Sequence, residues 1–345
     1  MSALAAPARE APPVAPARHR PRLGFLGVGW IGRHRLEAIA TDGCTEIAAI
    51  ADESREALAR AREVAPAAAE LDSLEALCEL DLDGVVIATP SALHAAQASA
   101  ALGCGLAVFC QKPLARTADE ATAVVRAARD ADRLLGVDFS YRHTRAMQAI
   151  HELVSIGELG EPYAVDLVFH NAYGPDKPWF RDPVLSGGGC VIDLGTHLVD
   201  LALWTLGFPG VQRVSSRLYC GGRVLADVTS AVEDYAIAQL ELDTGAVVRL
   251  ACSWNLPAGQ DAVIGVDFHG TRAGAALRNV NGSFYDFSAE YCRGTRRITL
   301  AEPPDAWGGR AAVAWARRLA TNARFDPDIE RAIDVARVLD AIYGR

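Results

Sequence analysis

Between residues 21 and 140, short continuous apolar runs alternate with longer segments of helical periodicity. The apolar runs have the length of strands that are buried on both faces of a sheet. We expect strands at residues 23–26, 46–51, 84–88, 106–110 and 134–139, and helices at 31–39, 55–64, 73–80, 91–102 and 117–131. The repeated order of strand and helix predicts an α/β domain with a doubly wound parallel sheet over residues 21–140.

The pattern changes near residue 141, where alternating polar and apolar positions replace the continuous apolar runs. Alternation of this kind is typical of strands with one buried face, and therefore of antiparallel sheets. We expect helices at 145–156 and about 191–206, and strands at 163–170, 211–220, 233–242, 246–254, 262–269, 275–279 and 297–300. Residues 141–325 are therefore predicted to form an α+β domain with a mostly antiparallel sheet.

The two ends of the chain differ from its body. Residues 1–20 are rich in Ala and Pro and contain no continuous apolar segment, so we expect a flexible tail rather than a signal peptide. Residues 327–343 show an amphipathic pattern, which predicts a helix that packs back on the body as a separate terminal segment, 326–345.

Composition narrows the class of protein. The chain has 345 residues, a net charge of −9 and a pI near 5.4, so neither a nucleic-acid footprint nor attraction to an anionic membrane is expected. No apolar run reaches the length of a membrane span. The eight cysteines lack metal-ligand spacing, which predicts free thiols in a reducing, cytoplasmic environment and no bound metal.

A glycine-rich turn joins the first predicted strand to the first predicted helix, and it reads Gly27-Val28-Gly29-Trp30-Ile31-Gly32. Such a turn directs free backbone N–H groups and the positive end of the helix dipole toward one point, which suits a pyrophosphate. The first glycine permits the tight turn, the second lets phosphates approach the backbone, and the third lets helix and strand pack closely. A plain packing turn is the alternative.

The acidic residue after the second predicted strand favours a dinucleotide. Asp52 lies 20 residues beyond Gly32, where a carboxylate accepts hydrogen bonds from the adenosine ribose. Because this carboxylate would repel a 2′-phosphate, NAD is favoured as the cofactor. Arg33, Ser54 and Arg55 are close enough in sequence to leave NADP open.

Three polar residues further along the chain are candidates for chemistry. Lys112 follows the run 106–110, so it projects from the carboxyl edge of the sheet, where ligands of open α/β sheets bind. Asp193 and His197 are four residues apart on a predicted helix, and therefore on one face. A surface lysine and a buried Asp–His pair that satisfies only itself are the alternatives.

Two other chemistries find little support. A zinc site built on Asp193 and His197 would need a third ligand such as His170, which has neither helical nor motif spacing to them. A serine hydrolase would need a nucleophile elbow, and the sequence contains none.

Aromatic and basic residues in two loops are further candidates for a substrate pocket. Trp179 and Arg181 precede the glycines at 187–189, and Tyr141 and Arg142 follow the last strand of the first domain. A role as loop anchors is equally consistent with the sequence.

The motifs, taken in order, resemble one family of enzymes. Their order and spacing match the glucose–fructose oxidoreductase and inositol dehydrogenase (Gfo/Idh/MocA) family, and the resemblance covers the chain beyond the tail. It implies a Rossmann domain followed by an open-faced sheet domain, an active site between them, and a homodimer or homotetramer. The motifs that carry it are Gly27-x-Gly29-x-x-Gly32, Thr89-Pro90 with His94, Gln111-Lys112-Pro113, and Gly188-Gly189-x-x-x-Asp193-x-Gly195-x-His197.

The resemblance also implies a role for each motif. The cofactor would contact the turn of Gly27, Gly29, Trp30, Ile31 and Gly32, together with Asp52, Thr89, Pro90, His94, Gln111 and Lys112. Lys112 would also bind the substrate hydroxyl, Asp193 would orient the substrate, and His197 would take or return the hydroxyl proton. Gln111 stands where the family usually has Glu, which changes the charge beside Lys112, and the family's Lys–Pro bond is often cis.

Our first hypothesis is therefore an NAD(P)-dependent oxidoreductase that transfers a hydride between nicotinamide and a secondary hydroxyl or ketone of a sugar, nucleotide-sugar or cyclitol. The alternatives are a dinucleotide-sensing regulator of the same fold without catalysis, and a glycosidase that uses bound NAD for transient oxidation.

Overall fold

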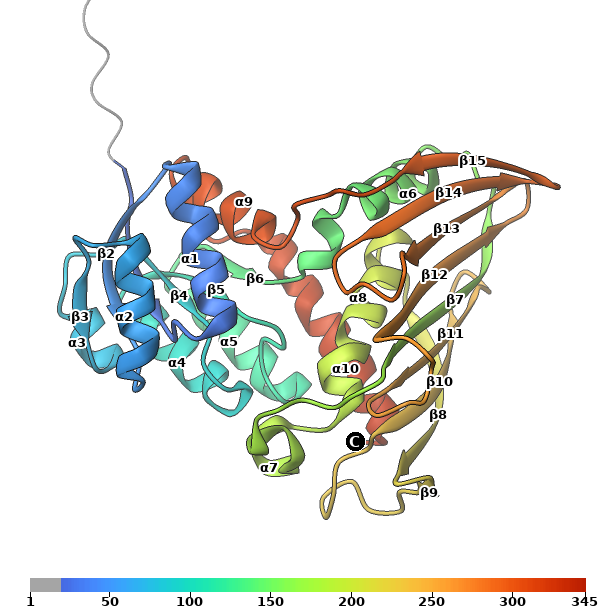
Figure 1. The fold of residues 1–345 in the computed structure, drawn as a ribbon, viewed down its shortest axis with the longest axis horizontal. Helices are drawn as coiled ribbons and strands as arrows, with labels where there is room; N and C mark the ends of the chain where they lie inside the picture. The colour runs from blue at the N-terminus through green and yellow to red at the C-terminus, as the bar shows by residue number, and fades with distance from the viewer. Residues whose placement is uncertain (1–19) are drawn as a thin grey trace, which may run out of the picture.

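The computed structural model describes residues 20–345, and the predicted tail therefore lies, except for Arg20, outside the described residues. The described chain folds around two sheets (Figure 1). None of its helices is long and apolar enough to cross a bilayer.

The first sheet confirms the predicted Rossmann architecture. Its strand order is β3-β2-β1-β4-β5-β6, and the pairings along it are parallel. The order reverses between β1 and β4, and this is where open α/β sheets bind ligands. The strands are β1 Arg22–Leu26, β2 Glu46–Ala51, β3 Ala69–Leu71, β4 Gly84–Ile87, β5 Ala107–Cys110 and β6 Leu135–Val137.

The helices between these strands begin where the sequence provides a cap. Ser54, Ser73 and Thr117 each accept a hydrogen bond from the backbone N–H three residues later. These bonds satisfy donors that the first turn of a helix leaves free. The helices are α1 Trp30–Asp42, α2 Arg55–Val64, α3 Leu74–Cys78, α4 Ser91–Gly103 and α5 Ala118–Asp130.

The second sheet is mostly antiparallel, as the alternating pattern predicts. Its order is β15-β14-β13-β12-β7-β11-β10-β8-β9, and only the β7–β11 pairing among these is parallel. The strands β9 and β14 were not expected: the first is two residues long, and the second has the same alternation of apolar and polar residues as its neighbours. The strands are β7 Pro162–Asn171, β8 Val211–Cys220, β9 Arg223–Val224, β10 Tyr235–Leu242, β11 Val247–Ser253, β12 Ala262–Gly270, β13 Gly274–Asn279, β14 Phe287–Arg293 and β15 Arg296–Ala301.

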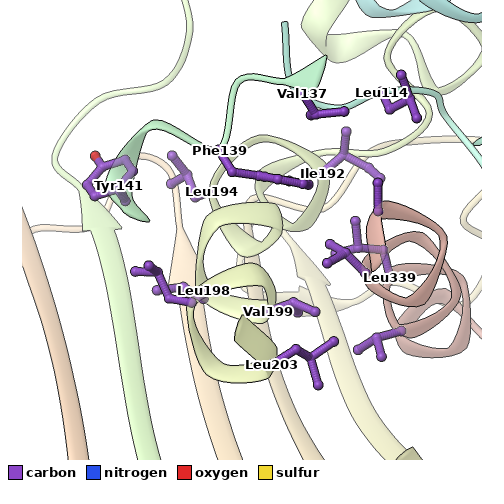
Figure 2. Close-up of a cluster of buried hydrophobic side chains, with 14 of the residues drawn as sticks. Leu114, Val137, Phe139, Tyr141, Ile192, Leu194, Leu198, Val199, Leu203 and Leu339 are labelled. Atoms are coloured by element: carbon purple, nitrogen blue, oxygen red, sulfur yellow. The ribbon is translucent and has the colours of Figure 1, made fainter. Parts of the chain in front are cut away.

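Helices α6 (Arg145–Ser155), α8 (Thr196–Thr205) and α10 (Arg331–Tyr343) cover one face of this sheet (Figure 1). Helix α8 is buried almost all round. Figure 2 shows Leu198 on the strand side of α8, and Val199 and Leu203 on the side of α10. Because α8 sits in the middle of this core, the residues at its start are held at a fixed height above the sheet.

Residues 191–206 were predicted to form one helix, but the structure divides them into two parts. Residues Val191–Gly195 form a π-helical turn, in which the Thr196 N–H donates to the Val191 carbonyl, and α8 begins after it. Other short turns connect the elements: 3₁₀ turns at Ser140–His143, Pro178–Arg181 and Pro327–Glu330, and the short helix α7 at Pro183–Ser186.

One helix of the segment 141–325 packs on the first sheet rather than on the second. Helix α9 (Arg310–Leu319), inside the segment 141–325, packs on the Rossmann sheet and against α1 (Figure 1). Its Trp315 ring lies 5.7 Å from the Phe109 ring and fits against Gly84 and Gly136, where a Cβ would come within 3.0 and 2.7 Å of the indole. The chain thus returns to its first domain after completing the second sheet.

We expect Trp315→Ala to lower the free energy of unfolding by about 3–5 kcal/mol, since it leaves a cavity beside the glycines that accommodate the indole. Chemical denaturation followed by circular dichroism measures this loss. Trp30→Ala is the matched control, because Trp30 is 56% exposed, and it should change stability by less than about 0.5 kcal/mol. Equal effects of the two substitutions would contradict the packing role of α9.

Candidate active site

A cavity of about 810 Å³ lies at the carboxyl edge of the Rossmann sheet. One wall comes from the first domain and includes the glycine-rich turn and Lys112, while the opposite wall comes from residues 175–193. The cavity therefore runs between the two domains, where the family resemblance places an active site.

The three glycines of the turn differ in what a side chain would meet at each position. Gly27 has φ +85°, and a Cβ there would lie 2.7 Å from the carbonyl of Ala88. A Cβ on Gly32 would lie 2.0 Å from the Gly27 oxygen, so only glycine permits this contact. A Cβ on Gly29 would have nothing within 4 Å, and Gly29 lines the cavity together with Trp30 and Ile31. The space above Gly29 and the start of α1 fit a pyrophosphate.

Asp52 stands beside this turn with its carboxylate fixed by the backbone. Its Oδ2 accepts from the Val28 N–H at 2.7 Å, and its Oδ1 accepts from the Ser54 N–H at 2.8 Å. Arg33 also lines the cavity, and its guanidinium is paired with Glu37 at 3.0 Å. The position of Asp52 fits a ribose partner, so the turn and this carboxylate together fit a dinucleotide.

The loops after β4 and β5 form the next part of the wall. The buried His94 ring lies 2.7 Å from the Pro113 carbonyl through Nδ1 and 2.8 Å from the Thr89 carbonyl through Nε2, so it ties the two loops together. Burial lowers the pKa of His94. Thr89, Pro90, His94 and Gln111 all line the cavity.

Lys112 and Asp193 are the point where the two domains meet across the cavity. The Lys112 Nζ donates to the Asp193 Oδ1 and to the Asp193 carbonyl oxygen, both at 2.8 Å. The Lys112–Pro113 peptide bond is cis, and the Gln111 side-chain oxygen accepts from the Lys112 N–H at 2.9 Å. Both charged side chains are less than one-fifth exposed, so their attraction is less screened than that of a surface pair.

Trp254 is a site residue that the sequence did not indicate. Its indole N–H donates to the Asp193 Oδ2 at 3.1 Å, so each carboxylate oxygen of Asp193 has its own donor. Trp254 follows β11 and is nearly fully buried, and in sequence it is indistinguishable from a core residue at the end of a strand. Only the pairing of distant segments brings it to Asp193.

His197 lies in the first turn of α8, 8% exposed, and is not among the residues that line the cavity. Its ring centroid is 4.7 Å from that of Tyr141. Burial first, and then the charges of Lys112 and Arg35, lower the pKa of His197 well below its usual 6.5. The imidazole is therefore neutral at physiological pH and lies within the electrostatic reach of Lys112.

Of the loop residues considered for a substrate pocket, only some lie at the cavity. Trp179 lines the cavity and stacks on Phe180 at 3.8 Å between ring centroids. Tyr141 is buried against the His197 ring, whereas Arg181 is exposed on the 178–181 turn and does not line the cavity.

Arg142 is a correction to the predicted substrate contacts. Its Nε donates to the Asp200 Oδ2 at 2.8 Å, its Nη2 contacts Oδ1, and its guanidinium lies over the ring of Phe139. Burial raises the pKa of Asp200, and the charge of Arg142 opposes that shift. A guanidinium that neutralises a buried carboxylate is committed to the core, so Arg142 is not assigned to the pocket.

No group of His, Cys, Asp and Glu residues within residues 20–345 could hold a metal ion. His170, considered as a third ligand, instead has its Nδ1 2.8 Å from the Ser253 Oγ. The eight cysteines are free thiols, as expected.

Comparisons with known proteins agree with this geometry. Residues 22–139 match the model of the oxidoreductase family with an NAD-binding Rossmann fold, and residues 147–276 match the GFO/IDH/MocA C-terminal domain. Among solved structures, levoglucosan dehydrogenase in complex with NADH superposes with a TM-score of 0.79 at 22% identity, covering 94% of this chain and 96% of that one. At this identity the likeness shows the fold.

Two curated relatives show how far the likeness extends in sequence. The chain is 30% identical over 268 residues to D-glucoside 3-dehydrogenase of Escherichia coli, covering 74% of this chain and 76% of the relative. It is 34% identical over 326 residues to D-xylose 1-dehydrogenase (NADP(+)) 2 of Haloferax volcanii, covering 93% and 95%. The models of both domains match the chain in the expected order, and residues of the family's motifs line the cavity. The chain therefore belongs to the Gfo/Idh/MocA family of NAD-binding oxidoreductases.

Proposed function

We propose that this enzyme transfers a hydride between nicotinamide and a secondary hydroxyl or ketone of a sugar, nucleotide-sugar or cyclitol. The observation that carries the proposal is the contact of Lys112 with Asp193 across the cavity, 2.8 Å between Nζ and Oδ1, at the end of the groove that begins at the glycine turn. The names of relatives that act on glucosides, xylose and inositol support the substrate class.

The cofactor would lie along the edge of the first sheet, with its pyrophosphate over Gly29 and its adenosine ribose near Asp52. Bound nicotinamide supplies the site that accepts or returns the hydride, and the protein contributes binding and electrostatics. The fixed Asp52 carboxylate favours NAD over NADP, since a 2′-phosphate would be placed against a negative charge.

The residues around the substrate hydroxyl would divide the remaining work. The Lys112 ammonium would stabilise negative charge on the reacting oxygen, and Asp193, held by Trp254, would fix the direction of Lys112 and bind a neighbouring hydroxyl. His197 would accept the hydroxyl proton during oxidation and return it during reduction. Trp179 offers an aromatic face to the apolar side of a sugar ring.

We also expect a cytoplasmic enzyme that works as a homodimer or homotetramer. The acidic balance, the free thiols and the second sheet, of which the helices within residues 20–345 cover one face, support this expectation.

Lys112→Ala and His197→Ala should each lower turnover by about 10²-fold or more, because one removes the charge at the reacting oxygen and the other the proton acceptor. A panel of sugars and cyclitols, followed by NADH absorbance, measures turnover, and fluorescence titration should show NADH binding retained. Lys177→Ala is the matched control, since Lys177 lines the same cavity and is exposed.

Near-normal turnover of both variants would refute the assigned chemistry. Wild-type protein that binds NADH but reduces no NAD with any compound of the panel would favour the regulator instead. Turnover of a glycoside without net NADH would favour the glycosidase.

The choice of cofactor is tested by titrating the wild type and Asp52→Ala with NADH and NADPH. We expect the wild type to bind NADH at least about tenfold more tightly, and the variant to lose most of this difference as the repulsion disappears. Tighter binding of NADPH than of NADH by the wild type would overturn the assignment.

The pH dependence of oxidation follows from the lowered pKa of His197. The neutral imidazole is the form that accepts a proton, and it persists as pH falls until the folded-state pKa is reached. The turnover number should therefore stay constant from neutral pH to 6.5 and fall only below it. A descending acid limb centred at or above pH 6.5 in buffered steady-state assays would assign the proton to another group.

A further inference from the structure

Glu233 is a fully buried carboxylate beneath the glycine-rich loop that precedes Asp193. Its Oε1 accepts from the Gly189 N–H at 3.0 Å and from the Val191 N–H at 2.8 Å, and its Oε2 also accepts from Gly189 at 3.0 Å. The Tyr343 hydroxyl, from the last turn of α10, donates to Oε1 at 2.8 Å. No ion pair among the described residues includes Glu233, and its hydrogen bonds come from these backbone N–H groups and the Tyr343 hydroxyl.

The loop packs on these two residues without spare room. A Cβ on Gly188 would lie 2.0 Å from the Tyr343 hydroxyl, and a Cβ on Gly189 would lie 1.9 Å from the Glu233 carbonyl oxygen. Arg345 closes the outer side, with its Nη2 donating to the Gly187 carbonyl at 3.0 Å. Tyr343 and Arg345 therefore form one side of the surface on which the glycine-rich loop packs.

The loop leads directly to the residue that contacts Lys112. The Gly189 carbonyl accepts from the Asp193 N–H at 3.1 Å, and Val191 begins the π-helical turn. The two backbone N–H groups that donate to Glu233 thus belong to Val191, the first residue of that turn, and to Gly189, whose carbonyl accepts from the Asp193 N–H. A shift here would move both Asp193 oxygens that Lys112 contacts.

We propose that Glu233, supported by Tyr343, is a positioning residue that holds the π-helical turn so that Asp193 meets Lys112 across the cavity. The proposal rests on the proposed function of that pair, and it makes α10 part of the active-site support. Burial raises the pKa of Glu233, and the hydrogen bonds from the Val191 N–H and the Tyr343 hydroxyl oppose this shift.

The sequence offers an internal reporter, because it contains only two lysines, Lys112 and Lys177. Lys112 is held by Asp193 with its side chain 17% exposed, whereas Lys177 is 65% exposed. The rate at which acetic anhydride acetylates each amine, read by mass spectrometry of the digested full-length protein, therefore reports on the Asp193 contact. The ratio of the two rates, measured in one reaction at one pH, cancels differences in reagent concentration.

We expect Glu233→Gln and Tyr343→Phe to raise the ratio of the Lys112 to the Lys177 acetylation rate about threefold to tenfold, because each substitution removes a hydrogen bond that involves Glu233. Tyr291→Phe is the matched control, since it removes another tyrosine hydroxyl that donates to a glutamate, Glu158, at 2.9 Å, but on the distant β14. The ratio in this control should equal that of the wild type.

An unchanged ratio of acetylation rates in both Glu233→Gln and Tyr343→Phe would overturn the proposal, even if their melting temperatures fall. An equal rise in Tyr291→Phe would also overturn it, because general loosening would then explain the result. Tyr343→Phe keeps the test decisive if Glu233→Gln does not fold. No substrate enters the measurement, so its failure is distinct from a failure of the proposed oxidoreductase activity.

Discussion

The contact between the Lys112 ammonium and Asp193 is the interaction on which the site depends. The two residues come from different domains, 81 positions apart, and meet at 2.8 Å in a partly desolvated cavity. Each partner is also held by its surroundings. The Lys112 N–H donates to the Gln111 side chain at the end of β5, and Asp193 lies in the π-helical turn and accepts from Trp254. A charged pair in such a place is useful only if its geometry is fixed, since both partners lose hydration.

Small residues make that geometry possible. Gly32 lets α1 approach the end of β1, and Gly27 lets that end lie against Ala88, while Gly188 and Gly189 let the second loop lie directly on Tyr343 and Glu233. In each place a Cβ would meet a backbone or buried atom, and at Gly27 the positive φ also favours glycine. Gly29 is the exception, and its open side faces the cavity.

The two domains are also joined away from the cavity. Helix α9 returns to the Rossmann sheet through Trp315, and α10 packs on α5 of the first domain and on α8 of the second (Figure 1). The side chains around α8, such as Leu198 and Val199, then fix the height of Asp193 and His197 above the second sheet (Figure 2). Asp193 and His197 therefore stand on packed helical turns rather than on free loops.

The sequence by itself determined the two sheet types and the glycine turn, because periodicity and turn chemistry are local properties. It also offered Lys112, Asp193 and His197 as candidates, from a strand end, a helix face and the motifs of the family that they resemble. The tertiary structure alone decided that Trp254 contacts Asp193, that Glu233 lies under the loop before Asp193, that α9 packs on the first sheet, and that Arg142 pairs with Asp200. Local pattern records whether a residue is buried. It does not record its partner, because contacts between residues 42 and 61 positions apart, such as Val191 with Glu233 and Asp193 with Trp254, depend on how whole sheets and helices pack.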